Sequence, residues 1–358
     1  MYYNWQENTS TEELKVVCNL IKNGELVIFP TETVYGIGAN AYNAEAVGKI
    51  FMAKGRPSDN PLIVHVAKKE DIDDIATDIT EVEAKLIDRF MPGPFTIILK
   101  KKKNVLPDIV TAGLDTVAVR MPNNVIARAI IAFAGVPIAA PSANISGRPS
   151  GTNIADIKKE LESKVSVVID GGNTQFGLES TVVKVEDEIP VVLRPGAVTP
   201  EQIKELVGTV KIDKNVFEKV GENEVVASPG MKHRHYAPQT KCQLIYSDDE
   251  KDLIFEMNKR VKKYRGDVVV IGFTEHKEEI VVSKHRYLDI GSKNNLEEYA
   301  KNIYSMLRKA DAIHPEIILI EGVKKENIGI AIMNRLLRTC EYDYIEKWKR
   351  GMYQFYLI

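Results

Sequence analysis

Apolar and polar positions along the chain follow two patterns, the 3.6-residue period of a helix and the short apolar run of a buried strand. The first helical pattern covers residues 11–23 (TEELKVVCNLIKN) and ends before Gly24, and an apolar strand pattern follows at residues 26–29. This order repeats to about residue 207. Two later apolar runs, 180–186 and 190–196, are close enough in the chain to pair as antiparallel strands. The pattern predicts an α/β fold with a mixed twisted sheet over residues 1–207.

The regular alternation stops at residue 208 and resumes at residue 242. Residues 208–241 include VVASPGMKHRHYAPQT, a stretch with two prolines, a glycine and clustered basic and aromatic residues, which we interpret as an interdomain linker. Strand and helix patterns then alternate again over residues 242–358. They predict a second, smaller, Rossmann-like α/β domain with a parallel sheet. A chain of 358 residues is also long for a single core.

Composition excludes several classes of protein. The net charge is -2, so no general basic surface is available for a nucleic acid or an anionic membrane. The three cysteines, Cys18, Cys242 and Cys340, are far apart and form no Cys-x-x-Cys pair, so we expect buried, reduced thiols. The N-terminus has no signal-peptide pattern, and no apolar stretch approaches the ~20 residues needed to span a bilayer. We expect a cytoplasmic protein with no membrane association.

The stretch FPTETVYGIGANA, residues 29–41, has the G-x-G-x-x-A spacing of a dinucleotide-binding turn. In that fold the glycine turn joins a strand directly to a helix, whose N-terminus faces the pyrophosphate. Here the polar residues 31–33 follow the strand, and the next helix is predicted only near residue 44. A nicotinamide-dependent oxidoreductase is therefore a weak alternative. No G-x-x-x-x-G-K-[ST] loop is present either.

Hydrogen-bond donors gather instead in turns beside predicted strands. Open α/β sheets bind ligands at strand ends, and the planar fork of arginine can hold a carboxylate or a phosphate with two hydrogen bonds. KGRPSDNPLIVHV and APSANISGRPSGT are the two densest turns. The candidate donors are Lys54, Arg56, Asn60, Arg120, Ser142, Asn144, Ser150, Ser180 and Arg194. His65 lies inside an apolar strand and could be either a core residue or a ligand contact.

Other kinds of site find little support. His233 and His235 could begin a metal site, but no carboxylate or cysteine follows at a suitable spacing. No G-x-S-x-G motif or paired Cys and His motif indicates covalent catalysis, so the serines are interpreted as binding residues. An RNA-binding module that uses Lys54, Arg56 and Arg148 stays as the alternative function, although the acidic balance and the lack of interleaved aromatics disfavour it.

With these motifs taken in order, the chain resembles the YrdC-like family, and specifically its two-domain members, the L-threonylcarbamoyladenylate synthases of tRNA modification. The resemblance covers essentially the whole chain, and SPGMKHRHYAP resembles the family's linker signature. The stretches that carry it in the first domain are FPTETVYGIGANA, KGRPSDNPLIVHV, PGPFTIIL, VAVRMP, PSANISGRPSG, STVV and LRPGAV.

The resemblance implies a nucleotidyltransferase that joins L-threonine, bicarbonate or CO2, and ATP into threonylcarbamoyl-AMP and pyrophosphate. This is the first step of threonylcarbamoyladenosine modification at tRNA position 37. A carbamate formed on the threonine amine is the nucleophile, so catalysis falls to positioning and charge neutralisation. Mg²⁺ is expected with ATP, its protein ligands being unknown. The product would pass to a downstream threonylcarbamoyl transferase, and direct tRNA contact stays open.

The resemblance also assigns residues, motif by motif. Lys54 and Arg56 are the catalytic pair at the phosphates. The ATP-binding set is Arg56, Asn60, Ser142, Asn144, Ser150, Arg194 and Tyr236, and the threonine-binding set is Thr33, His65, Arg120 and Ser180, with Arg120 on the carboxylate. Tyr236 would make the linker, 208–241, a lid over the nucleotide. TETVYGIGANA is expected to form a wall of the pocket, where glycine lets the substrate approach closely. The second domain shows no comparable donor-rich turn, and we expect it to anchor the lid or contact a partner.

Overall fold

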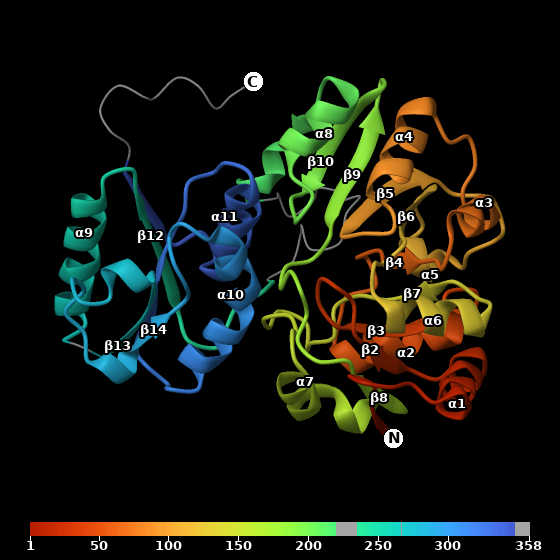
Figure 1. Ribbon diagram of the computed structural model, residues 1–358, viewed down its shortest axis with the longest axis horizontal. Coiled ribbons are helices and arrows are strands. Elements are labelled where there is room, and N and C mark those ends of the chain that lie inside the picture. The colour runs from red at the N-terminus through yellow and green to blue at the C-terminus, as the bar shows by residue number, and fades with distance from the viewer. Residues whose placement is uncertain (220–234, 266, 348–358) are drawn as a thin grey trace. The chain divides into compact units, whose positions relative to one another are not determined.

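The computed structural model describes residues 1–219, 235–265 and 267–347, and the chain divides into two units (Figure 1). The first unit contains Met1–Ser146 and Ser150–His233, and the second contains Gly147–Pro149 and Arg234–Ile358. Residues 220–234, which include much of the expected linker and His233, lie outside the described residues. In the described part of the chain, no helix is both long enough and apolar enough to cross a membrane.

The first unit is built on a mixed sheet of 11 strands in the order β1-β8-β2-β3-β7-β4-β6-β5-β9-β10-β11. Its strands are β1 (Tyr2–Asn4), β2 (Val27–Phe29), β3 (Gly36–Asn40), β4 (Ile63–His65), β5 (Phe95–Lys100), β6 (Thr116–Arg120), β7 (Ile138–Ala139), β8 (Val167–Asp170), β9 (Thr181–Glu186), β10 (Ile189–Arg194) and β11 (Lys211–Ile212). β9 and β10 pair antiparallel, whereas β4 and β6 pair parallel. The predicted mixed sheet is therefore confirmed.

Helices cover both faces of this sheet because consecutive strand residues point to opposite sides. Val27 and Phe29 of β2 join a core cluster with α1 and α6, while Leu26 and Ile28 join a second cluster with α2 and α4. The helices of the first unit are α1 (Thr11–Lys22), α2 (Ala44–Lys54), α3 (Ile72–Ile75), α4 (Glu81–Phe90), α5 (Asp108–Thr111), α6 (Val125–Ala134), α7 (Ile154–Leu161) and α8 (Pro200–Val207).

The glycine motif forms a strand and not a turn. Gly36 and Gly38 lie in β3, which pairs antiparallel with β2, so the strand-turn-helix unit of a dinucleotide site is absent at this motif. A Cβ at Gly38 would stand 2.6 Å from atoms of both Phe29 and Ile138. The expectation that glycine here makes room for a substrate is therefore wrong for Gly38, which makes room for two core side chains of the protein itself.

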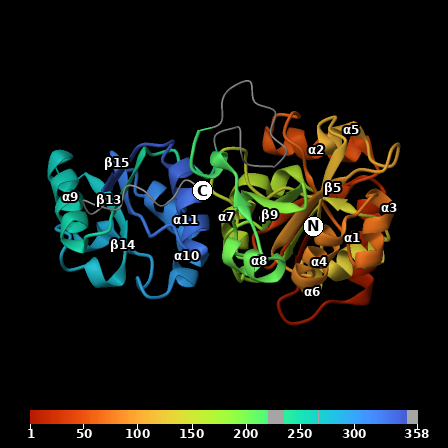
Figure 2. The same cartoon turned by 90° about the horizontal axis from the view of Figure 1, so that it is seen from above.

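The second unit contains a five-stranded parallel sheet in the order β14-β13-β15-β12-β16. Both views place this sheet between α9 on one face and α10 and α11 on the other (Figures 1 and 2). Its elements are β12 (Cys242–Ser247), α9 (Glu250–Lys263), β13 (Val268–Gly272), β14 (Tyr287–Asp289), α10 (Leu296–Asp311), β15 (Ile317–Glu321), α11 (Ile328–Thr339) and β16 (Tyr344–Lys347). The predicted parallel sheet is confirmed, and the three cysteines are buried and free as expected.

Candidate functional site

Backbone hydrogen bonds bring the predicted motifs of the first unit together around residues 31–36. The amide of Tyr35 donates to the carbonyl of Gly151 at 3.0 Å, and the amide of Ala143 donates to the carbonyl of Tyr35 at 2.7 Å. The amide of Gly177 donates to the carbonyl of Thr33 at 3.1 Å. Segments that are more than a hundred residues apart in the chain therefore meet beside the end of β2, as a composite site requires.

Arg120, the last residue of β6, forms the centre of the predicted threonine pocket. Its Nη1 donates to Thr33 Oγ1 at 2.9 Å, and its Nη2 donates to Glu32 Oε1 at 2.7 Å. The side chains of Arg120 and Glu32 are only 5% and 3% exposed. The structure thus joins two predicted residues and adds Glu32, a buried carboxylate that sequence reasoning missed.

His65 stands beside Arg120, because β4 and β6 pair with these two residues opposite each other. The imidazole is 3% exposed, and its ring meets the ring of Phe29 edge-on with 6.5 Å between the centroids. Burial, together with the positive charge of Arg120, lowers the pKa of His65 to about 3. The ring is therefore neutral near pH 7 and can offer a hydrogen bond to an uncharged group.

Ser180 and Arg194, predicted for different substrates, contact each other directly. Arg194 Nη2 donates to Ser180 Oγ at 3.1 Å, and its Nε donates to the Ser180 carbonyl at 3.1 Å. The segment 93–94 connects this pair to the threonine pocket, since Arg120 Nε donates to the Gly93 carbonyl and the amide of Thr181 donates to the Pro94 carbonyl. Ser180 therefore lies where the two predicted binding sets meet.

Lys54 is buried and holds one of the predicted phosphate-binding turns. It ends α2, which stops because Gly55 adopts the left-handed conformation at φ +61°. The Lys54 ammonium donates to the carbonyls of Ser142 at 2.5 Å and Asn144 at 2.6 Å, and it reaches Asn144 Oδ1 at 3.5 Å. Burial first, and then the charge of Arg56, lower the pKa of Lys54 well below its usual value. Its donors are used within the chain, so it positions this turn; its role at the phosphates stays a prediction.

The remaining predicted ATP-binding residues of the first unit lie in two further places. Arg56 Nη2 donates to the carbonyls of Pro61 at 3.2 Å and Asn60 at 3.4 Å. Ser150 Oγ donates to Glu179 Oε1 at 2.6 Å, and Glu179 is a second buried carboxylate that the sequence analysis did not single out. Its position directly before the predicted strand at 180–186 is the feature of the sequence that could have identified Glu179 as a site residue.

Tyr236 belongs to the second unit. It is 5% exposed, its ring stacks on Tyr304 with 5.5 Å between centroids, and the guanidinium carbon of Arg335 lies 5.4 Å from the Tyr236 ring centroid. Its backbone has a φ of +63°, an uncommon conformation for a residue with a side chain. These aromatic and cationic contacts come from α10 and α11 of the second unit. Its predicted contact with the nucleotide stays a prediction.

The described residues include no group of three or more His, Cys, Asp or Glu side chains arranged to hold a metal ion. His235, the described member of the histidine pair, accordingly belongs to no such group. Mg²⁺ that is bound with a nucleotide usually takes one or two carboxylates together with phosphate oxygens, so the expected ion does not require such a group. The expected Mg²⁺ would need the phosphate oxygens of ATP as ligands.

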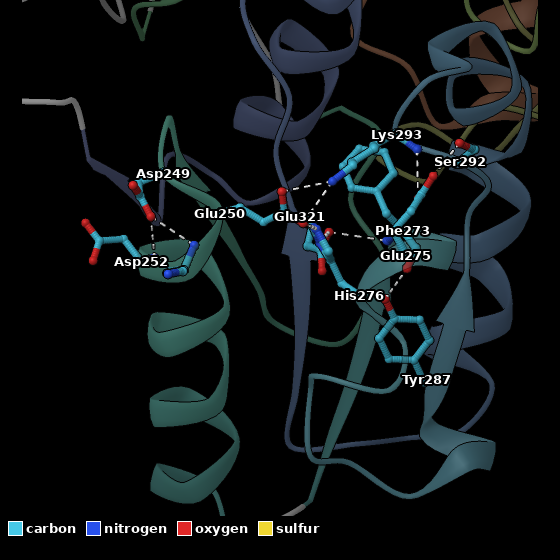
Figure 3. A network of polar contacts seen from close by, with 11 residues as sticks. Asp249, Glu250, Asp252, Phe273, Glu275, His276, Tyr287, Ser292, Lys293 and Glu321 are labelled. Carbon is cyan, nitrogen blue, oxygen red and sulfur yellow. Dashed lines mark hydrogen bonds and ion pairs between the residues drawn. The ribbon is translucent and has the colours of Figure 1, made fainter.

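A second concentration of polar contacts lies in the second unit, where β13 and β15 end (Figure 3). His276, which follows β13, is 2% exposed. Its Nδ1 faces Glu321 Oε2 at 2.9 Å, and its Nε2 faces Glu250 Oε1 at 2.9 Å. Lys293 also donates to Glu250 Oε1 at 2.8 Å. This cluster was not predicted from the sequence, because its members come from four separate segments.

We expect this cluster to make the stability of the chain depend on pH. Both ring nitrogens of His276 face carboxylates, which favours an imidazolium, and the hydrogen bond that the ring donates to Glu321 raises the pKa of His276. Burial also raises the pKa of Glu321, while the Lys293 contact keeps that of Glu250 low. A raised pKa in the folded state gives a stabilisation that is complete below the unfolded pKa and is lost as the pH rises through the folded pKa.

As the pH rises through the raised folded pKa of His276, the wild-type chain should lose more unfolding free energy than the His276→Gln variant does. Glu250 has a lowered pKa, stays ionised during this rise and does not contribute to the difference. Urea denaturation of both chains at a series of pH values measures it. Parallel curves for the two chains would contradict the assignment.

Comparisons with known proteins point to one family over the whole chain. A family model described as "Telomere recombination" matches residues 19–196, and one described as "Threonylcarbamoyl-AMP synthase, C-terminal domain" matches residues 198–340. The chain is 41% identical over 345 residues to a threonylcarbamoyl-AMP synthase of Pyrococcus abyssi, covering 96% of this chain and 98% of the relative. It is 40% identical over 333 residues to a threonylcarbamoyl-AMP synthase of Bacillus subtilis, covering 93% and 94%.

Solved structures give the same result. A crystal structure of P. abyssi Sua5 complexed with L-threonine has a TM-score of 0.90 to this structure at 38% identity, and the match covers 97% of this chain and 99% of the other. A variant of the same Sua5 protein has a TM-score of 0.91. These matches extend through both units, so they bear on the complete described fold.

Proposed function

The chain belongs to the threonylcarbamoyl-AMP synthase family, and from this premise we propose that its first unit transfers the AMP moiety of ATP to a carbamate of threonine. L-threonine, bicarbonate or CO2, and ATP are the substrates, and threonylcarbamoyl-AMP and pyrophosphate are the products. Family membership over nearly the full length decides against the RNA-binding module and the nicotinamide enzyme.

The observation that carries the proposal is the convergence of the Arg120 pocket with the turn that Lys54 holds. The segment 31–36 contributes Thr33 to the Arg120 pocket. The carbonyl of Tyr35, in the same segment, accepts a hydrogen bond from the amide of Ala143, which lies in the turn that Lys54 holds. A small amino acid and a phosphate chain could thus be held on either side of one backbone segment. Substrates held in this way would bring a nucleophile close to an α-phosphorus, as an in-line displacement requires.

The residues of the chain then act by binding and charge neutralisation. Arg120 faces the threonine carboxylate, and neutral His65 offers a hydrogen bond to the threonine hydroxyl. Arg56, Arg194 and the amide and hydroxyl groups of the turns neutralise the phosphates, whose leaving pyrophosphate gains charge in the transition state. Mg²⁺ would enter with ATP, held by phosphate oxygens. A cytoplasmic location and transfer of the product to a downstream threonylcarbamoyl transferase belong to the same proposal.

Pyrophosphate release tests the proposal directly. We expect the purified full chain, supplied with ATP, bicarbonate and Mg²⁺, to release pyrophosphate only when L-threonine is added, because the carbamate on its amine is the nucleophile. Mass spectrometry should detect threonylcarbamoyl-AMP in equal amount. Release at the same rate without threonine would indicate ATP hydrolysis and would contradict the proposal.

A further inference from the structure

The Glu32 carboxylate is buried, and only one of its two oxygens has a hydrogen-bond partner. Oε1 accepts from Arg120 at 2.7 Å, whereas Oε2 is buried without a donor among the described residues. A buried carboxylate oxygen without a donor costs free energy, and native chains rarely retain one without a reason. Glu32 Oε2 therefore marks an acceptor for a donor that the described chain does not supply.

The surroundings of Glu32 indicate which donor would fit. Its backbone is fixed, because the amides of Gln175 and Phe176 both donate to the Glu32 carbonyl. Its side chain stands against the guanidinium of Arg120, so one positive and one negative group lie side by side in the predicted threonine site. A free amino acid carries the complementary pair, a carboxylate and an ammonium on the same carbon. Charges arranged in this way favour the zwitterion over other small molecules.

We propose that Glu32 is a catalytic residue that accepts a hydrogen bond from the ammonium of threonine and then takes the proton that the amine must lose. The inference rests on the proposed function and adds to it the group that recognises the amine. A buried carboxylate held by a partner is a suitable general base, because its position is fixed before the substrate binds.

With CO2 as the carbon source, the step removes two protons from the threonine nitrogen and forms one N–C bond. The threonine ammonium gives one proton to Glu32 Oε2, and the lone pair left on nitrogen forms the N–C bond to CO2. One C=O electron pair becomes a lone pair on a carbamate oxygen, and the nitrogen loses its second proton to solvent water. Protonation removes the charge of Glu32, which weakens its contact with Arg120 and leaves that guanidinium to the threonine carboxylate.

The competing role for Glu32 is to orient Arg120 and nothing more. The two roles differ for (R)-3-hydroxybutyrate, which keeps the carboxylate and hydroxyl of threonine but lacks the ammonium. Calorimetric titration of the full chain with both ligands separates them. The chains to compare are wild type, Glu32→Gln, and Glu12→Gln as a matched control on the exposed side of α1.

We expect wild type and Glu12→Gln to bind threonine about 30-fold more tightly than 3-hydroxybutyrate, and Glu32→Gln to lose most of that preference. The kcat/KM of Glu32→Gln for threonine should also recover as the pH rises, because free threonine then arrives with its amine already deprotonated.

Two results would overturn the proposal. One is a Glu32→Gln chain that binds both ligands more weakly by the same factor, since that shows orientation of Arg120 alone. The other is a wild-type chain with equal affinity for both ligands, which needs no variant and is independent of whether Glu32→Gln folds. Threonine-dependent pyrophosphate release by wild type tests the proposed function separately, so the two failures can be told apart.

Discussion

Replacing Arg120 by alanine is expected to lower the free energy of unfolding by about 3 to 5 kcal/mol, because it leaves the Glu32 carboxylate buried and unpaired. Both side chains of this ion pair are almost completely buried, so water cannot replace the lost guanidinium without a rearrangement. Thr33 Oγ1 also loses the hydrogen bond from Arg120. Threonine affinity should fall about 100-fold or more, since the counter-charge for its carboxylate is gone. Urea denaturation and calorimetric titration of the full chain measure the two effects.

The control for this prediction removes both charges together. A double variant with Arg120→Gln and Glu32→Gln keeps groups that can hydrogen-bond and leaves no buried charge, so most of the stability should return while threonine binding does not. Arg128→Ala, on the exposed side of α6, should stay within about 0.5 kcal/mol of wild type. An Arg120→Ala chain as stable as wild type would mean that Glu32 is solvated or protonated in the folded protein.

Most helices and strands could be predicted because their apolar pattern extends over several residues. α10 and β13 are examples in which the burial follows the pattern along the whole element. β11 and β16 were not predicted. The two residues of β11 are both exposed, and the four residues of β16 are exposed or half-buried, so neither strand leaves an apolar run in the sequence.

The hydrogen-bond donors of the candidate site could be predicted from the sequence, but its buried carboxylates could not. Arginines, serines and amides at strand ends are visible in a sequence as residue types in turns. The partner of a buried carboxylate cannot be recognised in the sequence, because the two residues are distant in the chain. Glu32 pairs with Arg120 at a separation of 88 residues, and Glu321 meets His276 at a separation of 45.

Sequence also could not show which donors are already used inside the protein. Lys54 was predicted as a phosphate ligand from its type and motif, and the structure shows its ammonium bonded to the turn at 142–144. Burial is the physical reason. A buried ammonium must find oxygen acceptors, and the nearest ones are the carbonyls of Ser142 and Asn144.

A second large effect is expected at Arg56. Burial is the main cause of the lowered pKa of Lys54, and the positive charge of Arg56 adds to it. Both cations are held by backbone carbonyls, Lys54 by the turn at 142–144 and Arg56 by residues 60–61. We expect Arg56 to contribute more of the charge neutralisation at the phosphates, because a planar guanidinium can form paired hydrogen bonds with a phosphate. Arg56→Ala should cost about 2 to 4 kcal/mol of transition-state stabilisation, which is about 30- to 1000-fold in kcat/KM for ATP.

The loss should appear in kcat/KM for ATP and not in the affinity for threonine, because charge builds up on the leaving pyrophosphate and not on the amino acid. Arg56→Lys should restore only part of the rate, since an ammonium cannot form the paired hydrogen bonds of a guanidinium. Arg128→Ala serves again as the control, and single-turnover pyrophosphate release at saturating threonine is the measurement. An unchanged kcat/KM for Arg56→Ala would remove this residue from the phosphate site, and the turn held by Lys54 would then have to neutralise that charge through its backbone amides and hydroxyls.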